Sequence, residues 1–238
     1  MELLRNIMMV TTAAALVCGI FSGCADKNSP EHSVTEPLPT DSLNTVTAEF
    51  DTGTLKATEN AEEIGSFVIT LYPEYAPETC ENFADLVKDG FYDGLIFHRV
   101  MDGSISIAQT GDPTGTGKGG AEKKIKGEFA ANGFEQNTLS HTRGIVSMAR
   151  RNNDMDSASS QFFICYSDKD TVLDGNYAAF GEVTEGMEVV DKFLTVELVD
   201  NGHGEISVPT VPIAIEKAEM IEDDDKGHPQ ARFTMTIG

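Results

Sequence analysis

Two short stretches carry the residue types that could do chemistry: Ser160–Ile164 and, upstream, Phe97–Arg99. The first is an aromatic-rich apolar run between polar, turn-prone segments, which predicts a buried strand. Strand alternation places Gln161 and Phe163 on the same face. A buried amide without hydrogen-bond partners costs roughly 1–3 kcal/mol. An amide beside an aromatic ring suits a polar peptide group held against an apolar ring. Taken alone, the run also fits a barrel strand with one satisfied Gln.

The elements that must position these residues are short. Residues 65–71 predict a first strand, and a helix follows that starts near Pro77 and ends near Gly90. A second helix is expected over residues 185–194 and a late strand over 213–215. Many short strands with two isolated helices indicate a closed barrel capped at its ends.

A series of motifs in a fixed order resembles the cyclophilin family. They are Phe97-His98-Arg99-Val100, Gln109-Thr110-Gly111-Asp112, His141 to Ala149, Ser160 to Ile164, Leu173-Asp174-Gly175, Phe180-Gly181-Glu182-Val183 and Gly186 to Val190. The likeness covers roughly residues 63–220. It implies a mainly β fold, a closed eight-stranded antiparallel barrel capped by two α-helices, and peptidyl-prolyl cis-trans isomerase activity without cofactor or metal.

The resemblance also implies roles for single residues. Arg99 would place its guanidinium near the prolyl nitrogen, where a hydrogen bond removes amide resonance in the twisted state. Gln109 would orient Arg99, Gln161 would hold the peptide, and Phe163 and Leu173 would line a proline slot. The full expected substrate-binding set is Ile107, Gln109, Gly117, Ala149, Arg150, Gln161, Phe163, Leu173 and Tyr177. Polypeptides that contain X-Pro bonds are the expected partners of a monomer.

Several positions depart from the family pattern. The interval between Arg99 and Gln109 is longer, and the Phe expected after Gly103 is replaced by Ser104 or Ser106, with Ile105 or Ile107 as a partial replacement. Arg150 stands where Asn is usual, Val172 where many members have Trp, and Tyr177 where they have His. These changes leave a second hypothesis open: a non-catalytic module that binds proline peptides.

The amino terminus predicts export and anchoring. Residues 1–23 have the shape of a signal peptide, and Phe21-Ser22-Gly23-Cys24 resembles a bacterial lipobox, so Cys24 is the expected lipidated residue. Residues 24–60 predict a flexible polar linker, 61–220 the isomerase domain and 221–238 an acidic extension. The expected location is outside the cytoplasm, on the bacterial cell membrane. A solute-binding lipoprotein would fit this terminus but not the barrel motifs.

Composition excludes some functions. The net charge of −22 over 238 residues disfavours nucleic-acid binding, which calls for basic patches.

Three other features are expected to be structural. The Gly-rich stretch 111–119 has the wrong glycine spacing for a phosphate loop. Neither a Gly-x-Ser-x-Gly motif nor a zinc-protease His pair accompanies His98 and His141, so both histidines are expected to be structural. Cys80 and Cys165 lie in apolar segments, where a free Cys acts as a small hydrophobe.

Overall fold

The computed structural model describes residues 61–238. The expected signal peptide, the lipidation site Cys24 and the linker to residue 60 lie outside these residues. Within the described part of the chain, no helix is both long enough and apolar enough to cross a membrane.

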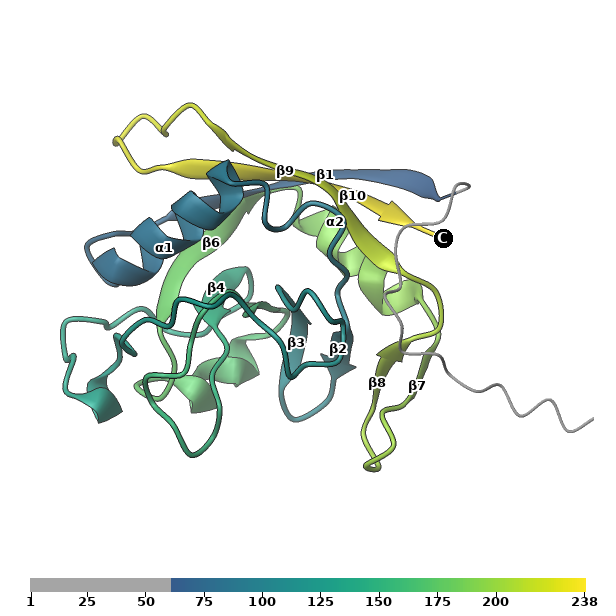
Figure 1. Ribbon diagram of the computed structural model, residues 1–238, viewed down its shortest axis with the longest axis horizontal. Coiled ribbons are helices and arrows are strands. Elements are labelled where there is room, and N and C mark those ends of the chain that lie inside the picture. Colours follow the sequence, from purple (N-terminus) through teal and green to yellow (C-terminus); the bar gives the residue numbers. More distant parts are fainter. Residues whose placement is uncertain (1–60) are drawn as a thin grey trace, which may run out of the picture. The chain divides into compact units, whose positions relative to one another are not determined.

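The fold is built on one curled antiparallel sheet of eight strands in the order β2-β3-β5-β4-β6-β1-β10-β9 (Figure 1). The strands are β1 (Glu62–Leu71), β2 (Arg99–Asp102), β3 (Ser106–Thr110), β4 (Ile145–Met148), β5 (Phe162–Cys165), β6 (Ala179–Glu185), β9 (Ile213–Ile221) and β10 (Gln230–Ile237).

The expected closed barrel is not confirmed, because the sheet is an open half-barrel. β2 and β9 stand at the two ends of the strand order and do not pair as strands. The segment before β2 approaches β9 instead, through an Ile96–Ala214 bridge and a bond from Phe97 N to Ile213 O of 2.8 Å. The seam is short because β2 begins only at Arg99.

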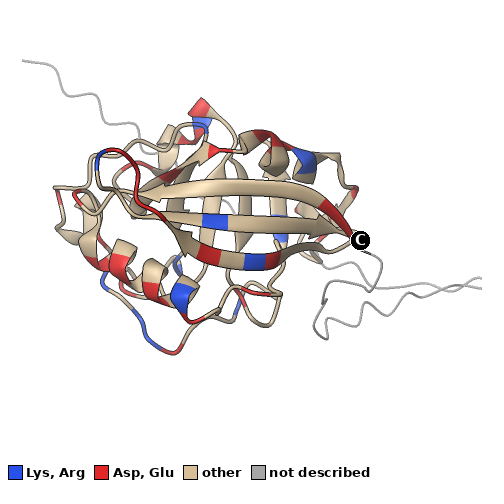
Figure 2. Cartoon of the chain, turned by 90° about the horizontal axis from the view of Figure 1, so that it is seen from above, with Lys and Arg blue, Asp and Glu red and all other residues tan. Residues whose placement is uncertain are grey.

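The last strand changes the predicted domain boundary. β10 lies between β1 and β9, pairs with both along its length, and buries Phe233 and Met235 completely. Figure 2 shows neighbouring strands crossing this face, with the C-terminus at one end. Residues 230–237 therefore belong to the central sheet and are not an appendage to it. The acidic run 222–225 leads into the turn between β9 and β10, where Asp224 Oδ1 accepts hydrogen bonds from Lys226 N and His228 N.

Two helical segments pack on the sheet. α1 (Pro77–Lys88) carries Pro at its start and buries the predicted stripe of Cys80, Phe83, Ala84 and Val87 against the core. α2 (Met187–Asp191) continues into the 3₁₀ turn η3 (Lys192–Thr195) and buries Val190 and Phe193. The second predicted helix is thus shorter than expected and ends in a tighter turn. Two further 3₁₀ turns are η1 (Ala130–Asn132) and η2 (Asp168–Leu173).

The apolar side chains form two separate clusters. The large one fills the inside of the sheet with packed rings, among them Phe83, Phe162 and Phe233, whose contacts through Phe162 are edge-on. The small one lies on the other face of β3 and β5 and has Ile107, Phe163, Cys165 and Leu173 at its centre. β5 feeds both clusters, because alternate residues of a strand point to opposite faces.

A hairpin stands beside this sheet as a second, two-stranded sheet. It consists of β7 (Leu198–Asp200) and β8 (Ile206–Pro209), and it lies next to β2 (Figure 1). No sequence pattern predicted this hairpin.

Candidate functional site

Three neighbouring strands bring the central predicted residues into one row. Arg99 of β2 is paired with Gln109 of β3, and Gln109 is paired with Phe163 of β5. Paired residues point to the same face of a sheet and touch across strands. The row therefore sets a guanidinium, an amide and an aromatic ring side by side on the face opposite the main core.

A chain of hydrogen bonds connects the polar members of this row. Arg99 Nη1 donates to Gln109 Oε1 at 3.2 Å, and Gln109 Nε2 donates to Gln161 Oε1 at 2.8 Å. Gln161 Nε2 in turn donates to the carbonyl of Gly119 at 2.7 Å. Both amides are thereby fixed in orientation, because each donates through nitrogen and accepts through oxygen. The contact expected between Gln109 and Arg99 is present, and Gln161, which is half-buried and not buried as expected, has hydrogen-bond partners for both its amide oxygen and its amide nitrogen.

The small apolar cluster packs beside the row, where the resemblance predicts the proline slot, and is called the slot cluster. Phe163 lies in it, and the Tyr177 ring meets the Phe163 ring edge-on at 5.8 Å. The residues that assemble here include five of the predicted substrate-binding set: Ile107, Ala149, Phe163, Leu173 and Tyr177. Apolar side chains next to oriented donors are what a ring-bearing peptide requires.

The structure shows which side chains take the place of the Phe that the family pattern predicts after Gly103. Ser106 points away from the slot: its side chain is buried and donates to Asp102 Oδ1 at 3.1 Å. Ile105 and Met101 pack on the slot cluster instead. Aliphatic side chains thus form the wall where the family pattern predicts an aromatic one. Val172, which replaces Trp, is exposed.

A polar cleft of about 350 Å³ adjoins the slot, and Ala149 borders both. Gln109, Gly117, Arg150 and Gln161 of the predicted set line this cleft. Every charged residue in its lining is basic: Lys118, Lys124, Arg150 and Arg151. This is a local reversal of sign on a chain whose net charge is −22.

Arg150 has a more specific position than the prediction gave it. Its guanidinium lies over the Tyr177 ring at 4.7 Å and over the Phe129 ring at 5.2 Å. Its Nε donates to the carbonyl of Asn176 at 2.9 Å. Arg150 therefore braces the Tyr177 side of the slot, in addition to bordering the cleft.

Asp112 shapes the Gly-rich loop on the far side of the cleft. Its Oδ1 accepts from Thr114 N at 2.7 Å, and its Oδ2 accepts from Thr116 N and Gly119 N, both at 3.1 Å. Burial alone would raise its pKa, but these hydrogen bonds hold the pKa of Asp112 below the ordinary value. Amides that a phosphate would need are thus bound to a carboxylate of the same loop, in agreement with the rejection of a nucleotide site.

Glu205 is a member of the site that sequence reasoning missed. It lies at the end of the β7–β8 turn, and both of its carboxylate oxygens accept from Arg99: Oε1 from Nε and Oε2 from Nη2, each at 2.8 Å. These bonds to Arg99 lower the pKa of Glu205 to about 2. No spacing pattern links residues 99 and 205, so the sequence alone does not indicate this contact.

A second cleft, of about 540 Å³, opens on the other side of Arg99, between the 114–118 loop and the hairpin. His98 borders it and is 7% exposed, and within the described chain neither ring nitrogen has a hydrogen-bond partner. Burial lowers the pKa of His98 to about 4, so the ring is neutral at pH 7.

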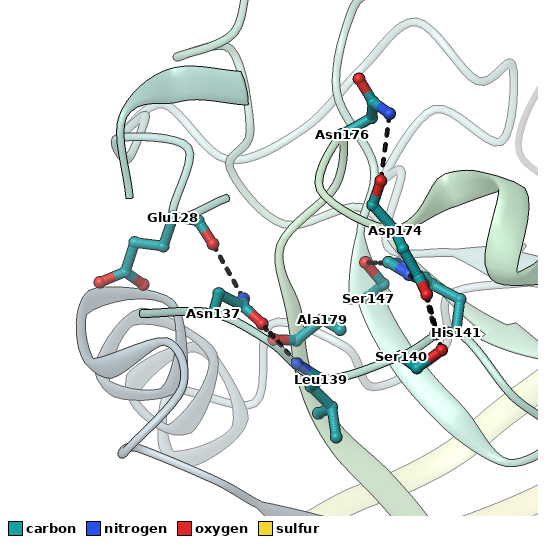
Figure 3. A network of polar contacts seen from close by, with 9 residues as sticks. All are labelled: Glu128, Asn137, Leu139, Ser140, His141, Ser147, Asp174, Asn176 and Ala179. Carbon is teal, nitrogen blue, oxygen red and sulfur yellow. Dashed lines mark hydrogen bonds and ion pairs between the residues drawn. The ribbon is translucent and has the colours of Figure 1, made fainter. Parts of the chain in front are cut away.

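The other predicted structural histidine, His141, belongs to a network beneath the slot cluster in which His141 and Ser147 are buried and Asp174 is 39% exposed (Figure 3). Its Nδ1 lies 2.8 Å from Asp174 Oδ1 and its Nε2 lies 2.9 Å from Ser147 Oγ. Asp174 also accepts from His141 N at 2.7 Å and from Ser140 Oγ at 2.6 Å. Because His141 and Ser147 are fully buried, this Asp-His-Ser arrangement cannot meet a substrate, and it ties the slot residue Leu173 to β4 through its neighbour Asp174.

Within residues 61–238, no group of three or more His, Cys, Asp or Glu side chains is placed to hold a metal ion. Cys80 and Cys165 are free and buried, and burial raises the pKa of both thiols, to about 12 for Cys80.

Comparison with known proteins gives one consistent family. Residues 55–220 match the model for cyclophilin type peptidyl-prolyl cis-trans isomerases. The chain is 38% identical over 164 residues to a peptidyl-prolyl cis-trans isomerase-like 1 of Aspergillus fumigatus, a match that covers 68% of this chain and 94% of the relative. It is 40% identical over 139 residues to a peptidyl-prolyl cis-trans isomerase of Helicobacter pylori, covering 58% of this chain and 80% of that protein.

A solved structure gives the same result for the fold. The crystal structure of a Cryptosporidium parvum cyclophilin-type isomerase, determined in the presence of the dipeptide Ala-Pro, aligns with a TM-score of 0.51 at 26% identity. The alignment covers 73% of this chain and 98% of that protein.

Proposed function

Because this chain belongs to the cyclophilin-type peptidyl-prolyl cis-trans isomerase family, we propose that it accelerates rotation of X-Pro bonds in exported or surface proteins. The observation that carries the proposal is the row of Arg99, Gln109 and Phe163 with the apolar slot beside it. A proline-containing dipeptide was present in the related Cryptosporidium structure, in keeping with this class of substrate.

The proposed mechanism follows from the barrier itself. Amide resonance raises the barrier to rotation of the peptide bond to ~18–20 kcal/mol. The slot would hold the pyrrolidine ring by apolar contact, and Gln161 would hold the peptide group next to it. Arg99 would donate to the prolyl nitrogen as it becomes pyramidal in the twisted state. That hydrogen bond forms only when resonance is lost, so it stabilises the transition state more than the ground state.

The proposal is tested by a protease-coupled isomerisation assay with the full 238-residue chain and a Pro-containing peptide. We expect clear acceleration by the wild type and a fall in kcat/KM of about 100- to 1000-fold in Arg99→Ala, the loss typical of a single transition-state donor. Arg232→Ala is the matched control, because Arg232 is an exposed arginine of β10, paired with Glu219 of β9. No acceleration by folded wild-type protein would refute the enzymatic role.

A non-catalytic module that binds proline peptides is the second candidate, and the aliphatic wall of the slot is the observation that favours it. Replacing a ring by smaller side chains removes contact area that would grip the proline. Titration of the peptide into wild-type protein separates the two candidates. Binding without acceleration supports the module, and acceleration supports the enzyme.

We also propose that the protein lies outside the cytoplasm, anchored through Cys24; the apolar segment before this residue and the polar sequence after it support the proposal. Labelling of growing cells with radioactive palmitate should mark the wild-type chain and not Cys24→Ala. Equal labelling of both chains would refute the anchor.

A further inference from the structure

The hairpin β7–β8 delivers a carboxylate to the arginine at the centre of the site. Glu205 accepts two hydrogen bonds of 2.8 Å from Arg99, one from Nε and one from Nη2. The two side chains are about one-third exposed, at 34% for Arg99 and 32% for Glu205. Arg99 borders the second cleft and can still be reached from solvent.

The turn that carries Glu205 is held by its own hydrogen bonds. Asn201 N donates to the Glu205 carbonyl at 2.9 Å, and Asn201 Nδ2 donates to Glu205 Oε1 at 3.3 Å. Asp200 Oδ1 accepts from Gly202 N at 2.6 Å and from Gly204 N at 3.2 Å. The position of the carboxylate is therefore fixed by the hairpin and does not depend on Arg99 alone.

The hydrogen bonds to Glu205 and Gln109 leave two N–H groups of the Arg99 guanidinium for other partners. A guanidinium has five N–H groups in one plane. Glu205 engages one on Nε and one on Nη2, and Gln109 engages one on Nη1. One N–H on each terminal nitrogen is left, and the carboxylate and the amide hold the plane of the group from two sides.

We propose that Glu205 is a positioning residue for Arg99: it holds the guanidinium in the orientation in which its remaining N–H groups serve the prolyl nitrogen. The inference rests on the proposed isomerase function. An arginine loses rotamer freedom when it is fixed, and here that loss occurs on folding, before a substrate arrives. Glu205 acts through Arg99 and does not touch the peptide.

The test compares Glu205→Gln and Glu205→Ala in two backgrounds, wild type and Arg99→Lys. Gln keeps the shape of the side chain but replaces one acceptor by a donor, so the paired contact is lost. We expect kcat to fall about tenfold in Glu205→Gln, with KM within about twofold, because orientation is lost and not ground-state binding.

In the Arg99→Lys background the same change should alter kcat by less than about twofold, since lysine has no planar fork for the carboxylate to orient. Glu197→Gln is the matched control: it removes an exposed carboxylate just before β7, for which no side-chain hydrogen bond is found in the described chain. A Glu205→Gln variant as active as the wild type, or an equal loss in both backgrounds, would overturn the positioning role.

A second readout does not depend on activity. The Nε–H resonance of Arg99 should be shifted downfield and exchange slowly with water in wild-type protein, and should lose both properties in Glu205→Ala. Thermal unfolding of each variant shows whether the hairpin and sheet are intact. If wild-type protein shows this signature but no isomerase activity, the proposed function fails and the positioning of Arg99 stands. If the resonance is the same in both proteins, the inference fails.

Discussion

Two polar networks flank Phe163, and they differ in almost every physical respect. On the β3 side, Gln109 pairs with Phe163 and leads to Arg99 and Glu205, which are about one-third exposed. On the β4 side, Ser147 pairs with Phe163 and leads to the fully buried His141 and then to Asp174, whose side chain is 39% exposed. The two networks thus differ at their centres: the Arg99 guanidinium can be reached from solvent, and the His141 and Ser147 side chains cannot.

The difference shows what each network can contribute. An ion pair that is one-third exposed adds little to stability, because water screens it and its side chains lose freedom. Its donors, however, remain available to a substrate. The buried His141 and Ser147 side chains cannot meet a substrate, but loss of one member of their network leaves buried groups without partners. We therefore expect mutations in the β3-side network to affect activity and mutations in the β4-side network to affect stability.

The largest effect on stability is expected for Asp174→Ala. The change leaves the His141 backbone N–H, the His141 ring and the Ser140 hydroxyl without their shared acceptor. We expect the free energy of unfolding to fall by about 2–4 kcal/mol, as measured by urea denaturation. Glu81→Ala, which removes an exposed carboxylate from α1, should change it by less than about 0.5 kcal/mol. Equal effects of the two changes would contradict the assignment of the His141 network to stability.

Acidification should destabilise the protein through His98. Its pKa is about 4 in the folded state, against an ordinary value of 6.5, because burial disfavours the charged ring. Between pH 4 and pH 6.5 the unfolded chain binds more protons than the folded protein. The contribution of His98 to stability is therefore fully present above pH 6.5 and declines as the pH falls towards 4. We expect a loss on the order of 2 kcal/mol from this residue between pH 7 and pH 4.5.

The measurement for His98 is the free energy of unfolding across this pH range in wild-type protein and His98→Phe. The variant should show a shallower decline. An unchanged slope would mean that His98 is protonated as easily in the folded state as in the unfolded chain. Burial lowers the pKa of His141 as well, so part of the decline should persist in the variant.

The smallest effect is expected at the basic cleft. Because Ala149 borders both the slot and this cleft, residues close to the proline in a bound peptide would meet Lys118, Lys124 and Arg151. Peptides with Glu within about three residues of Pro should have a kcat/KM about threefold higher than peptides with Lys there, and 0.5 M NaCl should abolish the difference. A preference for Lys would contradict the electrostatic assignment.

Local sequence patterns were enough to predict much of this molecule. The alternation in β5 placed Gln161 and Phe163 on the face of the site, and the helical spacing of Cys80, Phe83 and Val87 placed the buried stripe of α1. The ordered motifs identified the residues of the row and the slot. In each case, nearby residues determine which way a side chain points.

Contacts between distant segments could not be predicted in this way. The position of β10 between β1 and β9 depends on pairing with residues far away in the chain, and an acidic, turn-rich approach to this strand suggested a tail. The Arg99–Glu205 pair depends on a hairpin whose charges resemble any solvated turn. A sequence indicates which face of an element is buried more readily than it indicates which elements lie beside it. The strand order of the sheet and the contact between Glu205 and Arg99 therefore became known only from the structure.

The most direct test of the two-network account measures both quantities on Arg99→Ala and Asp174→Ala: isomerisation of a Pro peptide by NMR exchange spectroscopy, and the free energy of unfolding. For Arg99→Ala we expect exchange to fall to the uncatalysed rate while stability changes by less than about 1 kcal/mol. For Asp174→Ala we expect the loss of stability with exchange retained in the protein that remains folded. Wild-type exchange in folded Arg99→Ala would contradict the central claim that this arginine drives the reaction.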